Sequence, residues 1–64
     1  MNTDKLHRRH AVEEMTALSR STIYAIMDEG TFPRPVRIGK RAVAWRDSDL
    51  RAWLASRETA AQGA

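Results

Sequence analysis

Three consecutive hydrogen-bonding side chains, Arg20, Ser21 and Thr22, follow a serine that is well suited to begin a helix. The hydroxyl of Ser19 can accept a hydrogen bond from a backbone N–H that the first helical turn leaves unpaired. Side chains on that turn are exposed at the positive end of the helix dipole, where anions are favoured. Because such side chains hydrogen-bond to phosphates and base edges, the segment has the chemistry of a DNA-recognition helix.

Each of these side chains has a second interpretation. Arg20 is expected to read guanine through two hydrogen bonds in the major groove, and a contact to phosphate is the alternative. Ser19, Ser21 and Thr22 are expected to bind phosphates or bases, although capping alone would account for Ser19. Tyr24 is expected on the solvent side of the helix, where it would either bind a phosphate or pack against the segment that follows.

A second cationic group lies in a predicted tight turn, Gly39-Lys40-Arg41. Lys40 and Arg41, together with Arg37, are expected to lie against the DNA backbone or to enter the minor groove, whose negative potential attracts arginine. The alternative is a turn that is only solvated. Arg34 and Arg46 are weaker candidates for DNA contacts.

The distribution of charge agrees with these two groups. The 64-residue chain has a net charge of +3, and residues 17–46 hold six of its cations against two acidic residues. A basic stripe suits a polyanion such as DNA, although a merely soluble basic surface would have the same charge. The sequence therefore predicts double-stranded DNA as the partner.

Other chemistry is poorly supported. The chain has no cysteine, which excludes disulfides and thiolate metal sites, and His7 and His10 have no clear third metal ligand. The serines lack a matched base, and a chain of this size leaves little room for a pocket. We expect no enzymatic activity, metal, cofactor or small-molecule ligand. Without a membrane-length apolar run or a signal-peptide pattern, we expect a cytoplasmic protein associated with the nucleoid and no membrane partner.

Two helices are expected to position the first group. Residues 10–16 predict a short helix with apolar residues on one face, and Ala17-Leu18 predicts a turn. A second helix is expected from Ser19 to Glu29 and should end at Gly30, a residue favoured just beyond helix C-termini. The core residues expected from this part are Met15, Leu18, Ile23 and Ile26.

The remaining residues predict a linker, a hairpin and a last helix. The prolines of Thr31–Pro35 favour an extended linker. Strands are expected at Val36–Ile38 and Ala42–Trp45, with four residues on a shared inner face: Val36, Ile38, Val43 and Trp45. Asp47 is expected to cap a helix over Ser48–Arg57, with Leu50, Trp53 and Leu54 as its apolar stripe. Trp45 and Trp53 are expected in the core rather than as surfaces for stacking bases. Residues 1–8 have no clear pattern, although Leu6 could anchor the entry to the fold.

The order helix, turn, helix, hairpin, helix predicts a mainly α fold with a small β-hairpin, which is a winged helix-turn-helix. We expect this domain over residues 1–58, followed by a flexible tail at residues 59–64.

The sequence resembles the AlpA family of prophage-type regulators, which belong with the excisionase-like and MerR-like winged-helix domains. The segments that carry the resemblance are Leu18–Tyr24, Gly30–Gly39, Arg41–Arg46 and Trp53-Leu54. The resemblance covers about residues 8 to 57, and it implies a DNA-binding transcriptional regulator of a prophage or mobile element. Ala17 departs from the glycine that is usual in the family, and it would be strained if the turn needs a positive φ. Glu13 stands where an apolar residue is expected.

Three functions remain open. A sequence-specific transcriptional regulator would recruit or block RNA polymerase, whereas an excisionase-like factor would bend DNA for a recombinase. The domain is small, so pairs or tandem copies of the chain could share one DNA site. The third possibility is a protein-interaction module, which would require an exposed apolar patch. Apart from the tail alanines and Met27, the sequence offers no candidate for such a patch.

Overall fold

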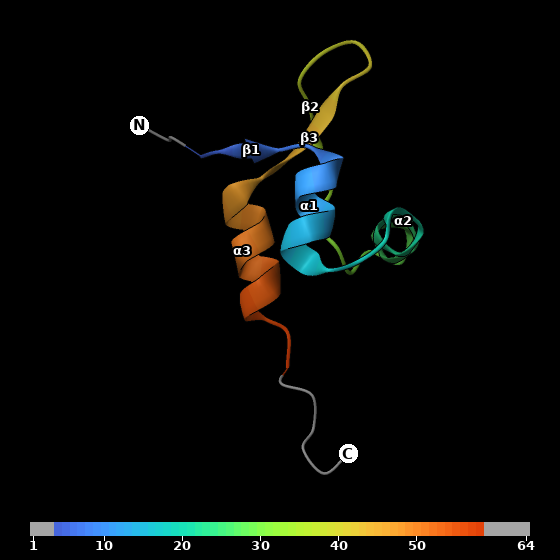
Figure 1. Ribbon diagram of the computed structural model, residues 1–64, viewed down its shortest axis with the longest axis vertical. Helices are drawn as coiled ribbons and strands as arrows, with labels where there is room; N and C mark the ends of the chain where they lie inside the picture. The colour runs from blue at the N-terminus through green and yellow to red at the C-terminus, as the bar shows by residue number, and fades with distance from the viewer. Residues whose placement is uncertain (1–3, 59–64) are drawn as a thin grey trace.

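The computed structural model describes residues 4–58, which form three helices and a three-stranded antiparallel sheet (Figure 1). The strand order is β1-β3-β2, so the last strand in sequence lies in the centre of the sheet. The mainly helical composition agrees with the expected winged helix-turn-helix. The predicted tail at residues 59–64 lies outside the described residues. The elements are β1 (Leu6–His7), α1 (Arg9–Thr16), α2 (Arg20–Asp28), β2 (Val36–Arg37), β3 (Val43–Arg46) and α3 (Asp47–Ala55).

The turn between α1 and α2 is built on a left-handed alanine. Ala17 has φ 61° and ψ 22°, and its N–H donates to the carbonyl of Glu13 over 2.8 Å. This conformation costs an alanine roughly 1–2 kcal/mol because its Cβ approaches the following carbonyl oxygen. Ala17 therefore occupies a position that favours glycine, the residue that is usual here in the family that the sequence resembles.

Both ends of α2 follow the local signals. The Ser19 hydroxyl accepts the N–H of Thr22 over 3.2 Å at the start of the helix. At the other end, Gly30 has φ +82°, a conformation in which glycine has no Cβ penalty. The N–H groups of Gly30 and Thr31 donate to the carbonyls of Met27 and Ile26, which is the Schellman pattern. The predicted cap and the predicted end of this helix are confirmed.

One apolar cluster joins all three helices to the sheet and the linker. Trp45, the largest of the fully buried side chains, lies in β3, and Leu50 lies on α3. Phe32 comes from the linker, and its burial was not predicted from the sequence. The buried members of the cluster are Val12, Ile23, Met27, Phe32, Trp45 and Leu50, and the partly buried residues packed against them are Met15, Leu18, Ile26, Val43 and Trp53.

The hairpin register contradicts the predicted inner face. Val36 pairs with Ala44, and Arg37 pairs with Val43. Because paired residues project from the same face of a sheet, Val36 shares a face with Ala44 rather than with Trp45. A three-residue turn sets this register, since the N–H of Ile38 donates to the carbonyl of Ala42 over 2.9 Å. The side chain of Ile38 is 45% exposed, so its assignment to the core was wrong.

The first strand, β1, was not predicted from the sequence. Leu6 pairs with Arg46 and His7 with Trp45, which places β1 on the edge of β3 opposite the hairpin. Two residues are too few to show strand periodicity, so no pattern marked this segment. Leu6 is 46% exposed, and main-chain pairing holds the strand instead of the expected anchoring side chain.

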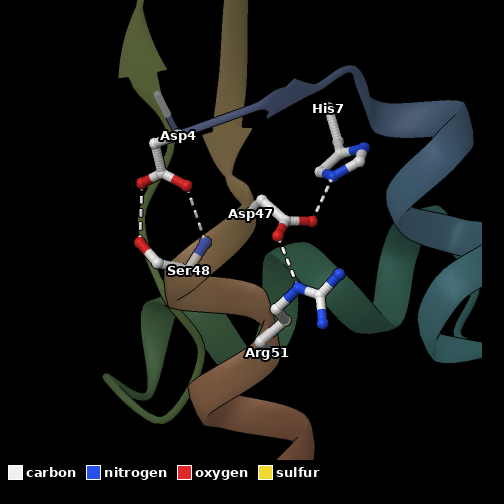
Figure 2. Close-up of polar contacts among 5 residues, drawn as sticks. All are labelled: Asp4, His7, Asp47, Ser48 and Arg51. Atoms are coloured by element: carbon white, nitrogen blue, oxygen red, sulfur yellow. Dashed lines mark hydrogen bonds and ion pairs between the residues drawn. The ribbon is translucent and has the colours of Figure 1, made fainter. Parts of the chain in front are cut away.

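The start of α3 differs from the prediction in a related way. Asp47 is the first residue of the helix and not its cap (Figure 2). Asp4 supplies the capping carboxylate, which accepts the N–H of Ser48 over 3.0 Å and its hydroxyl over 2.6 Å. The Asp47 carboxylate instead contacts Nε2 of His7 at 2.7 Å and accepts a hydrogen bond from Nε of Arg51 at 2.5 Å. The helix ends at Ala55, two residues before the expected Arg57.

Within residues 4–58, none of the helices has the length and apolar character that crossing a membrane requires.

Candidate nucleic-acid interface

The hydroxyls on the first turn of α2 pair with each other. Ser19 accepts the backbone N–H of Thr22, and its own hydroxyl donates to Oγ1 of Thr22 over 3.0 Å. Both side chains are exposed, as are those of Arg20 and Ser21. Capping therefore engages Ser19, whereas Arg20 and Ser21 project into solvent beside it.

Arg20 and Tyr24 lie one helical turn apart on the exposed surface of α2. The guanidinium carbon of Arg20 is 5.6 Å from the centroid of the Tyr24 ring, which is within the range of a cation–π contact. Tyr24 is 38% exposed, in agreement with its predicted place on the solvent side. The contact restricts the long arginine side chain, so that less conformational freedom would be lost when it binds.

The opposite face of α2 fixes the helix to the body of the domain. Ile23 is fully buried, and Met27 is 9% exposed. Met27 therefore belongs to the core, and the suggestion that it contributes to an exposed patch was wrong. Since one stripe of α2 is buried and the other is open, the helix presents its polar first turn outward.

The loop between β2 and β3, residues 38–42, forms the wing. Nη1 of Arg37 donates to the carbonyl of Lys40 over 3.1 Å, so this side chain braces the turn. Lys40 and Arg41 are exposed within the loop. Among the three residues predicted to contact DNA from the wing, the side chains of Lys40 and Arg41 therefore project into solvent. The Arg37 side chain instead stabilises the turn.

Two indole groups hold the linker that joins α2 to the wing. Nε1 of Trp45 donates to the carbonyl of Pro33 over 2.9 Å, and Nε1 of Trp53 donates to that of Thr31 over 2.8 Å. Between these two carbonyls, Phe32 turns into the core and meets the Trp53 ring edge-on, with 4.8 Å between centroids. The linker therefore keeps α2 and the wing in a fixed relationship, and both project away from α3 (Figure 1).

Trp45 and Trp53 are packed to different extents. Trp45 is fully buried, as expected for a core residue. Trp53 is half-buried against the core, and the Arg57 guanidinium lies 4.6 Å from its ring centroid. Neither ring is presented as an open stacking surface.

Arg34, Arg46 and the two histidines lie outside the two groups of residues predicted to contact DNA. Nη2 of Arg34 lies 3.5 Å from the carbonyl oxygen of Met27, near the end of α2, whereas Arg46 is exposed in β3. His7 contacts Asp47, and His10 contacts Arg9. Among the described residues, no three His, Cys, Asp or Glu side chains gather as a metal site, and no pocket is found.

The contacts of Asp47 affect its titration. The hydrogen bond from His7, followed by that from Arg51, lowers the pKa of the Asp47 carboxyl below its ordinary value of 3.8. Both contacts favour the ionised carboxylate. This carboxylate lies at the N-terminus of α3, and α1 lies between α3 and α2 in Figure 1.

The chain is similar to known prophage and phage proteins. The model of a family described as "Prophage CP4-57 regulatory protein (AlpA)" matches residues 5–58. A curated relative, the "Uncharacterized protein ORF88" of Enterobacteria phage P4, is 46% identical over 46 residues, which cover 72% of this chain and 52% of the relative. The chain therefore spans about half the length of that relative.

Proposed function

The chain belongs to the AlpA family of prophage regulatory proteins, and from this premise we propose that it is a sequence-specific binder of double-stranded DNA. In this proposal it regulates transcription of a prophage or mobile element and catalyses no reaction. The first turn of α2 lies in the major groove, and the wing lies on the backbone or in the minor groove.

The observation that carries the proposal is the orientation of α2. Ile23 and Met27 bury one stripe of the helix, so the hydrogen-bonding side chains of its first turn face solvent. A recognition helix requires this division, because its N-terminal residues must reach base edges while its other side stays in the core. Arg20 is the residue assigned to a base, since its guanidinium can bind guanine with two hydrogen bonds.

The wing supports the same proposal independently. Lys40 and Arg41 are exposed in a loop that Arg37 braces through the Lys40 carbonyl. Because two indole hydrogen bonds hold the linker, the wing and α2 can meet one DNA molecule together. Such a two-part contact gives sequence readout from the helix and non-specific affinity from the wing.

The test is selection from a random pool of duplexes by the purified protein, followed by affinity measurement. We expect a common sequence to emerge and to bind at least about 10³-fold more tightly than scrambled DNA, which is the lower end for specific binders. Measurements on both duplexes must share one salt concentration. An unenriched pool and equal affinities would contradict sequence-specific binding.

A further inference from the structure

Ile38 is an apolar side chain held outside the core by the main chain of the wing. Its N–H donates to the carbonyl of Ala42 over 2.9 Å, which fixes the residue at the base of the loop. The side chain is 45% exposed. Ile38 directly follows β2, and continued alternation places it on the face of Val36 and the buried Ala44, opposite the face of Trp45.

The residues next to Ile38 in the sequence are cationic. Arg37 precedes it, and Lys40 and Arg41 follow within the same loop, all three with exposed side chains. The Arg37 brace on the Lys40 carbonyl keeps this loop folded back on its strand. An apolar side chain flanked by cations is complementary to a ligand whose apolar surface lies between two rows of negatively charged groups.

We propose that Ile38 packs against the deoxyribose walls of the DNA minor groove while Lys40 and Arg41 contact the flanking phosphates. This inference rests on the proposed DNA binding and assigns the wing to one groove. The minor groove is about 6 Å wide and has a strong negative potential, and apolar side chains such as isoleucine are among those that proteins insert into it.

Leu6 provides a matched control within the same molecule. It is 46% exposed, close to the value for Ile38, and its pairing with Arg46 places it on the same face of the sheet. The two residues differ in position, because β1 and β2 lie on opposite edges of β3. A minor-groove contact made by the wing involves Ile38 and not Leu6, whereas a protein docking over the sheet face would cover both.

The experiment compares Ile38→Ala with Leu6→Ala on a duplex that the wild-type protein has selected from a random pool. We expect Ile38→Ala to weaken binding about tenfold, which corresponds to the lost burial of roughly two methylene-sized groups. Its dependence on salt should match that of the wild type, because no phosphate contact is removed. Leu6→Ala should bind like the wild type. Hydroxyl-radical footprinting, which attacks sugars in the minor groove, should lose the protection under the wing only in Ile38→Ala.

Each other result overturns the inference in a distinct way. Equal affinities for Ile38→Ala and the wild type would remove Ile38 from the contact, while leaving the proposed DNA binding intact. Similar losses of DNA affinity in both variants would instead indicate that another protein molecule, such as a second copy of the chain, packs against this face of the sheet. If the wild-type protein selects no duplex, the proposed function itself fails. Thermal melting checks that both variants stay folded, as expected for exposed positions.

Discussion

The indole N–H of Trp53 donates to the carbonyl of Thr31 over 2.8 Å, which links α3 directly to the segment where α2 ends. The same ring packs edge-on against Phe32. The last helix therefore holds the segment that directly follows α2, at a residue 22 positions earlier in the chain.

Two substitutions at Trp53 separate its ring from its hydrogen bond. Trp53→Phe keeps an aromatic ring and should cost about 0.5–1.5 kcal/mol, the usual contribution of one hydrogen bond. Trp53→Ala also removes the packing and should cost about 2–4 kcal/mol, less than a fully buried tryptophan would. Urea denaturation followed by circular dichroism measures both values. A Trp53→Ala protein as stable as the wild type would show that the ring does not support the core.

Ala17→Gly should stabilise the domain by about 0.5–1 kcal/mol. The left-handed conformation at φ 61° strains alanine, and glycine relieves the strain at some cost in chain entropy. The matched control is Ala25→Gly, at an exposed position inside α2, which should destabilise by about 1 kcal/mol. Denaturant titrations of both variants show whether each substitution raises or lowers the free energy of unfolding. Destabilisation by Ala17→Gly would mean that chain entropy outweighs the strain.

Arg20→Ala should lower the ratio of specific to non-specific DNA affinity, because this guanidinium is assigned to a base edge. The loss expected for one such contact is about 1–3 kcal/mol on the selected duplex, with little change on scrambled DNA. The double variant Lys40→Ala, Arg41→Ala should weaken both duplexes by similar factors. If the double variant collapses the ratio and Arg20→Ala leaves it unchanged, the wing is the reading element.

Binding should weaken steeply with salt, since residues 17–46 hold most of the positive charge. Each neutralised phosphate contributes about −0.9 to the slope of log K against log salt concentration. Removing Lys40 and Arg41 together should therefore flatten the slope by about 1.8. Anisotropy titrations across salt concentrations measure this. A slope that is near zero in the wild type would show that phosphate contacts contribute little.

The contacts of Asp47 should make the free energy of unfolding depend on pH in the acidic range. The folded-state pKa of this carboxyl is lowered, so its contribution is present above the unfolded value of 3.8 and is lost as pH falls through the folded value. The difference in stability between wild type and Asp47→Asn should be largest near neutral pH and should shrink below about pH 4. Denaturation at several pH values checks this. A constant difference down to pH 2 would show that the charge of Asp47 contributes nothing.

The parts of the fold predicted from sequence are those that short-range signals determine. Ser19, Gly30 and Ala17 each act on backbone groups within five residues, so the helix-turn-helix could be placed from local chemistry. The exposed side of α2 followed from helical spacing. That exposed side carries Arg20 and Ser21, which form one part of the candidate interface.

The parts that could not be predicted depend on pairing between distant segments. The residues of β1 have no period of their own, and Asp4 caps a helix 44 residues away. The inner face of the hairpin depended on whether Ile38 pairs with Ala42, and apolar alternation alone suggested the wrong face. This error concerned a candidate contact residue, because it concealed the exposure of Ile38.

The pairing of β1 with β3, far away in the sequence, has a consequence for folding during synthesis on the ribosome. Among the described elements, β1 leaves the exit tunnel first, yet its strand partner is β3, and His7 contacts a residue 40 positions later on α3. Translation must therefore pass Ser48 before Asp4 can cap α3. The edge strand that is made first therefore stays without its strand partner until β3 has emerged from the ribosome.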